Sequence, residues 1–182
     1  MRRRAACPNA RSAAPALFAL AMGGLTSIAA GHSASDAYLT MTAAALPGRG
    51  VIHGQWDIAL RDLDFVLKLD DNGDGRVTWG ETKHHLAAIE HYAYAHLRID
   101  DDAGNPCAIK PGAPKIDGHA DGAYAALFFD VVCAHAPKSI TVHYDLFFAI
   151  DPSHRGIFVM HNADDVATSV LSPQNATIDL AL

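Results

Sequence analysis

The stretch AYAALFFDVV, residues 123–132, decides the fold, because it is apolar, rich in aromatic side chains and free of Gly and Pro. A run of this composition and length is typical of a β-strand in a folded core. Further strand candidates, separated by Pro, Gly, Asp and Asn, are residues 107–110, 140–150, 156–161 and 176–180. Short strands at this spacing predict a β-sandwich.

Two more strand candidates precede this region. Residues 37–46 alternate in character, with Tyr and Thr on one face and Leu39 and Met41 on the other. The turn sequence Pro-Gly-Arg-Gly, residues 47–50, leads into the second candidate, residues 51–60. This pattern predicts a β-hairpin.

Helical spacing replaces the strand pattern downstream of the hairpin. Leu60, Leu63 and Leu67 recur at i, i+3 and i+7, and residues 81–98 carry a longer apolar stripe of the same period. The sequence therefore predicts an α+β fold. We expect a mainly antiparallel β-sandwich of about seven strands, with a helix–loop–helix segment, residues 60–98, inserted between the hairpin and the later strands.

Composition and charge narrow the classes of partner. Half of the 182 residues are hydrophobic and 19% are charged, as in a chain that folds. The formal charge is −6, but the first 30 residues hold four Arg and no acid, so the remainder carries 10 basic and 20 acidic residues. An acidic surface argues against binding to nucleic acid or to anionic lipid, and it favours cations.

The N-terminal segment, residues 1–31, has the three zones of a secretory signal peptide. A basic start is followed by an apolar stretch, residues 13–28, and by small residues that fit a cleavage site. An uncleaved membrane anchor is the alternative, but the apolar stretch is short and is broken by Gly23-Gly24. We expect one exported domain, residues 32–182, that is periplasmic or secreted and not inserted in a membrane after cleavage.

Export determines how the cysteines are interpreted. Cys7 leaves with the signal peptide, and Cys107 and Cys133 remain as an even pair. In an oxidising compartment such a pair predicts a disulfide. A metal site of Cys and His is the alternative, but the chain has no C-x-x-C spacing.

One motif is specific: DDNGDGRVTWGE, residues 70–81, matches the twelve-residue EF-hand calcium loop. The expected Ca²⁺ ligands are Asp70, Asn72, Asp74, Thr78 and Glu81, with the backbone carbonyl of Arg76. Gly75 stands at the sixth position, where the chain reverses. A solvated turn between two helices is the alternative. The sequence contains no second loop of this pattern, and EF-hands normally pair, so we expect a structural role.

The histidines raise a separate question, because ten of them follow His32. No two histidines of the stretch 81–98 stand at i and i+4, so the spacing favours surface or hydrogen-bonded histidines over a transition-metal site. Cleavage after Ala29 is a further alternative, because it would leave Ala30-Gly31-His32, a square-planar chelate for copper or nickel.

Five blocks of sequence together resemble the exported N-terminal domain of bacterial membrane proteins of the HupE/UreJ type. These blocks are residues 35–39, 54–64, 70–81, 121–124 and 151–156. The resemblance implies a setting of hydrogenase or urease accessory function and of nickel or cobalt uptake. In that family a multi-helix membrane domain follows and carries the proposed transport residues. This sequence ends at Leu182, so no transport residue is carried over.

We therefore expect an exported calcium-binding module with a structural or interaction role. The alternative is an ectodomain that handles nickel, cobalt or copper for a membrane-protein partner. An enzyme is the least favoured class, because the sequence has neither G-x-S-x-G nor H-E-x-x-H. The pair Asp151 and His154 is the one catalytic alternative that the sequence leaves open.

Overall fold

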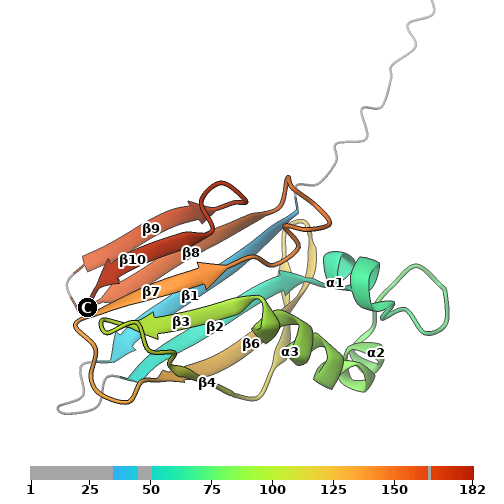
Figure 1. Ribbon diagram of the computed structural model, residues 1–182. Helices are drawn as coiled ribbons and strands as arrows, with labels where there is room; N and C mark the ends of the chain where they lie inside the picture. Colours follow the sequence, from blue (N-terminus) through green and yellow to red (C-terminus); the bar gives the residue numbers. More distant parts are fainter. Residues whose placement is uncertain (1–34, 45–50, 164) are drawn as a thin grey trace, which may run out of the picture. The chain divides into compact units, whose positions relative to one another are not determined.

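The computed structural model describes residues 35–44, 51–163 and 165–182 (Figure 1). All of these residues belong to one compact unit, Ser33–Leu182. The expected signal peptide, the copper chelate ending at His32 and the expected turn at 47–50 lie outside the described residues. Within the described part of the chain, no helix is long and apolar enough to cross a membrane.

The larger of two sheets has seven strands, ordered β4-β6-β2-β1-β8-β9, with β5 also paired to β6. The bounds are β1 Asp36–Ala44, β2 Val51–Ala59, β4 Ala108–Pro111, β5 Lys115–His119, β6 Gly122–Val132, β8 Arg155–Asn162 and β9 Asp165–Leu171. The predicted hairpin is confirmed, because β1 and β2 pair antiparallel. One pair, β1 with β8, is parallel.

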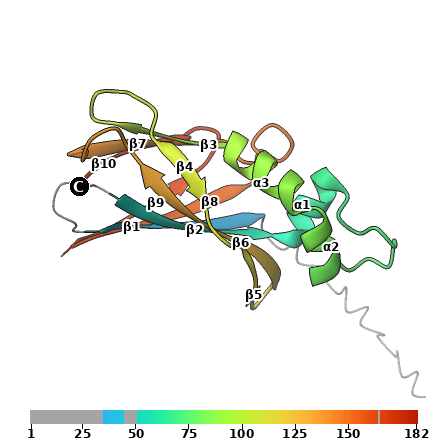
Figure 2. The same cartoon turned by 90° about the horizontal axis from the view of Figure 1, so that it is seen from below.

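The smaller sheet is antiparallel and has the order β10-β7-β3. Its strands are β3 Leu97–Asp101, β7 Ser139–Tyr144 and β10 Thr177–Ala181. Figure 2 shows this sheet lying over the larger one. Trp56 of β2 contacts Tyr144 of β7, with ring centroids 5.5 Å apart. A Cβ at Gly156 of β8 would lie 2.8 Å from the Tyr144 ring, so the close approach of the two sheets requires glycine there.

Three helices lie together at one end of the sheets (Figure 1). They are α1 Leu60–Leu67, α2 Trp79–His84 and α3 Leu86–Ala95. Leu63 of α1 and Ile89 and Ala93 of α3 are fully buried in the core. Tyr94 of α3 packs edge-on against Phe129 of β6, at 5.8 Å between ring centroids. Helices α1 and α3 therefore share one hydrophobic core with the strands.

The predicted β-rich α+β class is confirmed, but several boundaries differ. The single helix expected over residues 81–98 is divided into α2 and α3 at His85, and strand β3 begins at Leu97. Leu97 and Ile99 are buried while Arg98 is exposed, so the period there is that of a strand. The strand expected over residues 140–150 ends at Tyr144, before Phe147 adopts a positive φ of 60°.

Three strands have no counterpart in the sequence prediction: β3, which begins inside the expected helix, and β5 and β9. Strands β5 and β9 are mostly exposed or half-buried, so neither carries the apolar run that identifies a buried strand. β9 pairs only with β8 in the sheet order and forms an edge of the larger sheet. The described residues contain ten strands where about seven were expected.

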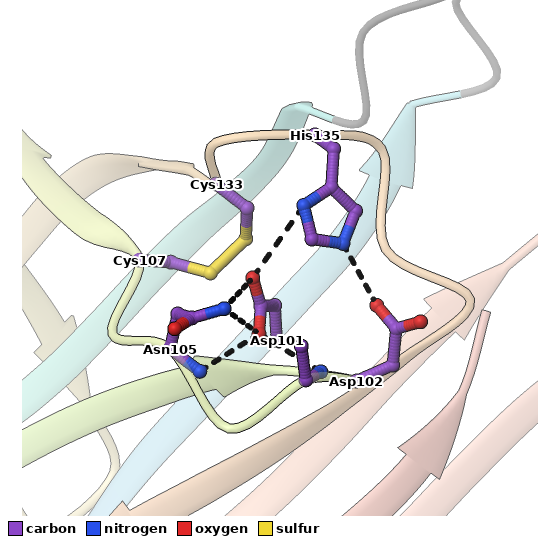
Figure 3. The surroundings of a disulfide bond; sticks show 7 residues. Asp101, Asp102, Asn105, Cys107, Cys133 and His135 are labelled. Atoms are coloured by element: carbon purple, nitrogen blue, oxygen red, sulfur yellow. Dashed lines mark hydrogen bonds and ion pairs between the residues drawn. A yellow bond between two sulfur atoms is a disulfide. The ribbon is translucent and has the colours of Figure 1, made fainter.

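The predicted disulfide joins Cys107 to Cys133, with Cα atoms 4.3 Å apart (Figure 3). Ala108 and Val132 are partners in the β4–β6 ladder, so the two cysteines extend that ladder by one position. The bond closes the chain across a sequence separation of 26. It stabilises the fold by about 3.5 kcal/mol in the chain-entropy model.

Candidate metal centre

The loop between α1 and α2 begins with a defined helix end. Lys68 adopts the left-handed conformation and donates its backbone N–H to the Asp64 carbonyl. The Asp64 carboxylate then accepts hydrogen bonds from the backbone N–H groups of Leu69 and Asp70, at 2.7 and 3.0 Å. Leu69 is fully buried. The backbone of Asp70, the first candidate ligand, is therefore held in place by α1.

The Asp70 carboxylate lies inside the curve of the loop. Its Oδ1 accepts hydrogen bonds from the backbone N–H groups of Gly73 and Asp74, at 2.8 and 3.2 Å. Its Oδ2 accepts from the N–H of Gly75, at 2.7 Å. Gly73 and Gly75 have φ values of +71° and +79°, which side chains with a Cβ rarely adopt. The two glycines allow the backbone to wrap around Asp70.

Asn72 and Asp74 each accept one hydrogen bond from a backbone N–H two residues further along the chain. Asn72 Oδ1 accepts from the N–H of Asp74 at 2.8 Å, and Asp74 Oδ1 accepts from the N–H of Arg76 at 2.9 Å. The amide of Asn72 also donates to Asp74 Oδ2, at 3.3 Å. These bonds hold the two side chains against the backbone of the loop.

Glu81 closes the loop from the other end. Thr78 is the N-cap of α2 and forms a capping box with Glu81. Glu81 Oε2 accepts from the backbone N–H and the hydroxyl of Thr78, at 2.8 and 2.7 Å. Glu81 Oε1 accepts from the N–H of Asp71, at 3.2 Å, so this carboxylate bridges the start and the end of the loop.

The electrostatics keep Glu81 ionised. The backbone N–H of Thr78, followed by its hydroxyl, lowers the pKa of Glu81, while burial and the nearby charge of Asp70 act in the opposite direction. Glu81 is 9% exposed and is held on the first turn of a helix. A charged carboxylate in this position suits a hard cation that binds oxygen.

All of the predicted residues lie in this one loop. Two of them, Thr78 and Arg76, also form hydrogen bonds that shape the loop. Thr78 uses its hydroxyl as a helix cap, and Arg76 donates its amide to Asp74. Asp70, Asn72, Asp74 and Glu81 supply side-chain oxygens of the kind that Ca²⁺ requires. The donor set fits calcium, and each of these four side chains already has one or more hydrogen bonds that set its direction.

A second group of ligand-type side chains adjoins this loop and was missed from the sequence. Asp71 lies 2.9 Å from His84 Nδ1 and 2.8 Å from His85 Nε2. Hydrogen bonds from His85 and then from His84 lower the pKa of Asp71. The spacing of the histidines relative to one another gives no signal for this cluster. Residues three and four positions after Glu81 share its helical face, and this spacing would have placed both rings near the loop.

Other histidines lie beside aspartates on separate elements. The pairs are His53–Asp130, His96–Asp145, His119–Asp57, His135 with Asp101 and Asp102, and His143–Asp100. Within the described residues, the pairs of His53, His96, His135 and His143 fit the expectation of hydrogen-bonded histidines, and His119 lies 3.7 Å from Asp57.

The catalytic alternative, Asp151 with His154, takes a different form. His154 is fully buried, and its Nε2 lies 2.7 Å from the Tyr144 hydroxyl. Ser35 Oγ donates to Asp62 at 2.9 Å and lies 2.7 Å from His154 Nδ1. Since the Ser35 proton is already donated, His154 Nδ1–H donates to Ser35 and Nε2 accepts from Tyr144. Burial lowers the pKa of His154 to about 4, so the ring is a neutral part of the core.

Comparison of the chain with protein-family models gives no match, and comparison with curated proteins gives none either. The resemblance to the HupE/UreJ type therefore stays a prediction from the sequence.

Proposed function

We propose that this protein is an exported calcium-binding module, with one Ca²⁺ held by the EF-hand-like loop Asp70–Glu81. The observation that carries the proposal is the direction of the side chains: the loop is curled around Asp70, and Glu81 reaches back to its start. The ligands would be the side chains of Asp70, Asn72, Asp74, Thr78 and Glu81, together with the carbonyl of Arg76. Calcium supplies the positive charge that offsets the repulsion between three carboxylates.

The role that follows is structural. The loop joins α1, which is anchored in the core by Leu63, to α2, in which Glu81 and Thr82 are buried. An ion bound by residues from both ends of the loop would fix the angle between these helices. Calcium would stabilise the folded state by mass action, by about 2.7 kcal/mol at a concentration one hundred times the dissociation constant.

The proposed location is the periplasm or the cell exterior. The Cys107–Cys133 disulfide supports it, because disulfides persist in oxidising compartments. Extracytoplasmic compartments also hold calcium at concentrations that suit a single, modest site.

The test is calorimetric titration of chelator-stripped protein with calcium. We expect one site, strong weakening in Glu81→Gln, and little change in Glu90→Gln. Glu90 is the matched control, because it is the only other glutamate and lies on α3, away from the loop. Magnesium should bind poorly, since it demands a smaller octahedral shell. An unchanged titration in Glu81→Gln would place any bound calcium elsewhere.

The alternative function is the handling of nickel, cobalt or copper for a membrane-protein partner. One observation favours it: two imidazoles converge on the Asp71 carboxylate. The two functions differ in the ligands of the metal site. Calcium would be bound by oxygen atoms alone, whereas nickel, cobalt or copper would be bound by imidazole nitrogen together with carboxylate oxygen. A screen of the purified protein against calcium, nickel, cobalt and copper at equal concentration separates them.

A further inference from the structure

Asp71, His84 and His85 form a compact cluster next to the loop. Their ligand atoms, one from each residue, all lie within 4.8 Å of one another. Ligand atoms around a tetrahedral zinc ion lie about 3.4 Å apart, given metal–ligand bonds of about 2.0–2.1 Å. A contraction of up to about 1.4 Å is open to exposed side chains, and the side chain of His84 is 73% exposed.

We propose that Asp71, His84 and His85 bind a divalent first-row transition metal, through one carboxylate oxygen and two imidazole nitrogens. Imidazole suits zinc, copper and nickel, whereas calcium prefers oxygen. The cluster would therefore select a different cation from the loop Asp70–Glu81. This inference goes beyond the calcium proposal and does not need calcium to occupy the loop.

The backbone explains how two consecutive histidines reach one carboxylate. Neighbours in a continuous α-helix point about 100° apart. His84 is the last residue of α2, and His85 is the cap residue between α2 and α3, with φ −94° and ψ 7°. His84 presents its near nitrogen, Nδ1, and His85 its far nitrogen, Nε2. The helix breaks at His85, and the two rings use nitrogens at different distances from the backbone. As a result both rings reach Asp71, with their centroids 4.8 Å apart.

Asp71 is held in place independently of the histidines. Its backbone N–H donates to Glu81 Oε1, which fixes the second loop residue beside the first turn of α2. His84 and His85 follow on that same side of the helix. The three ligands therefore sit on a frame that is formed before any metal binds, which lowers the entropic cost of binding.

Metal binding requires one unprotonated nitrogen on each imidazole. His84 Nδ1 and His85 Nε2 are the nitrogens that face Asp71. A neutral imidazole has one N–H, so a metal bound at these two nitrogens places that proton on the other nitrogen of each ring. The exposed His84 ring and the half-exposed Asp71 leave room for water to complete the coordination shell.

The experiment is calorimetric titration of the calcium-saturated protein with zinc, which has no redox chemistry. We expect one zinc per chain and at least tenfold weaker binding in His84→Ala, in His85→Ala and in Asp71→Asn. His91→Ala is the matched control and should bind zinc normally, because His91 is an exposed histidine on α3. Melting temperatures of the variants verify that each one folds.

Two outcomes would overturn the inference: no stoichiometric zinc binding, or an affinity that His84→Ala and His91→Ala change equally. Calcium titrations on the same variants keep the two proposals apart. Loss of zinc with calcium binding intact in His84→Ala supports a separate site. A protein that binds calcium but no zinc contradicts only the transition-metal site. A protein that binds zinc but no calcium contradicts only the calcium proposal.

Discussion

Two aspartate-rich turns in this protein look alike in sequence and differ in how their carboxylates are satisfied. The loop Asp70–Glu81 and the turn around Asp101 each contain a glycine in the left-handed region, Gly75 at φ +79° and Gly104 at φ +77°. Asp101 is 3% exposed and accepts from the N–H groups of Ala103 and Asn105. Those amides, chiefly that of Asn105, lower its pKa.

The second turn is also closed by other parts of the protein. Figure 3 shows His135 between Asp101 and Asp102, beside the Cys107–Cys133 disulfide. In the loop Asp70–Glu81, by contrast, Asp71 and Asp74 are exposed and Asp70 is half-buried. The two ends of this loop are joined by Glu81 and by the contacts of Asp71 with His84 and His85. Under our proposal a cation balances the charge of Asp70, Asp74 and Glu81 in the first turn. In the second turn the buried Asp101 is held by backbone amides and by His135, beside a disulfide.

The largest expected effect is on the second turn. Replacing both Cys107 and Cys133 by serine should destabilise the protein by about 3.5 kcal/mol in the chain-entropy model. Denaturant unfolding measures this loss. Calcium affinity, measured by calorimetry below the melting temperature, should stay the same, because the disulfide lies outside the loop Asp70–Glu81. A parallel fall in calcium affinity would show that the two turns are not independent.

The next largest effect is the loss of stability at acidic pH, which we attribute to the buried His154. Its pKa is about 4 in the folded protein, below the ordinary value of 6.5. The unfolded chain therefore binds the extra proton between these values. The stability that the neutral ring contributes is complete above about pH 6.5 and is lost as the pH falls through 4, by on the order of 3 kcal/mol.

The measurement is chemical denaturation between pH 4 and 7 with calcium removed by chelator, so that the loop carboxylates are compared at constant occupancy. His154→Gln should be less stable at pH 7 and should show a flatter pH dependence than the unaltered protein. Asp62, whose pKa burial raises, is present in both proteins. Equal slopes in the two proteins would contradict the assignment.

The smallest expected effect on stability comes from replacing Gly75 or Gly104 by alanine. An alanine at Gly75 or at Gly104 meets no atom within 4 Å, so each change costs only its conformational strain. That strain is about 1–2 kcal/mol at either position. Gly75→Ala should also weaken calcium binding, whereas Gly104→Ala should not. Melting curves and calcium titrations of both variants test this difference, and equal calcium affinities would count against a role for Gly75 in shaping the site.

The sequence predicted those features that depend on local patterns. The hairpin β1–β2, the strand β6 and the pair Cys107–Cys133 are confirmed. These features follow from alternation, apolar runs and an even cysteine count. The predicted calcium ligands are contiguous in sequence and lie in the one loop between α1 and α2, and their binding of calcium stays a prediction.

Other features depend on contacts between distant residues. The parallel pairing of β1 with β8 joins segments more than 100 residues apart, and no local pattern specifies it. The edge strand β9 is stabilised by one neighbouring strand and needs no apolar run. The break at His85 and the cluster on Asp71 arise because the loop folds back onto α2, which histidine spacing alone does not reveal.

The most direct test of the account is equilibrium dialysis of the purified protein against radioactive calcium, with one variant in each turn. The account predicts one ion per chain in the unaltered protein and in Asp102→Asn, where the change removes an exposed carboxylate from the second turn. It predicts no bound ion for Glu81→Gln at the same free calcium. Retention of calcium by Glu81→Gln, or its loss in Asp102→Asn, would contradict the assignment of the ion to the loop Asp70–Glu81.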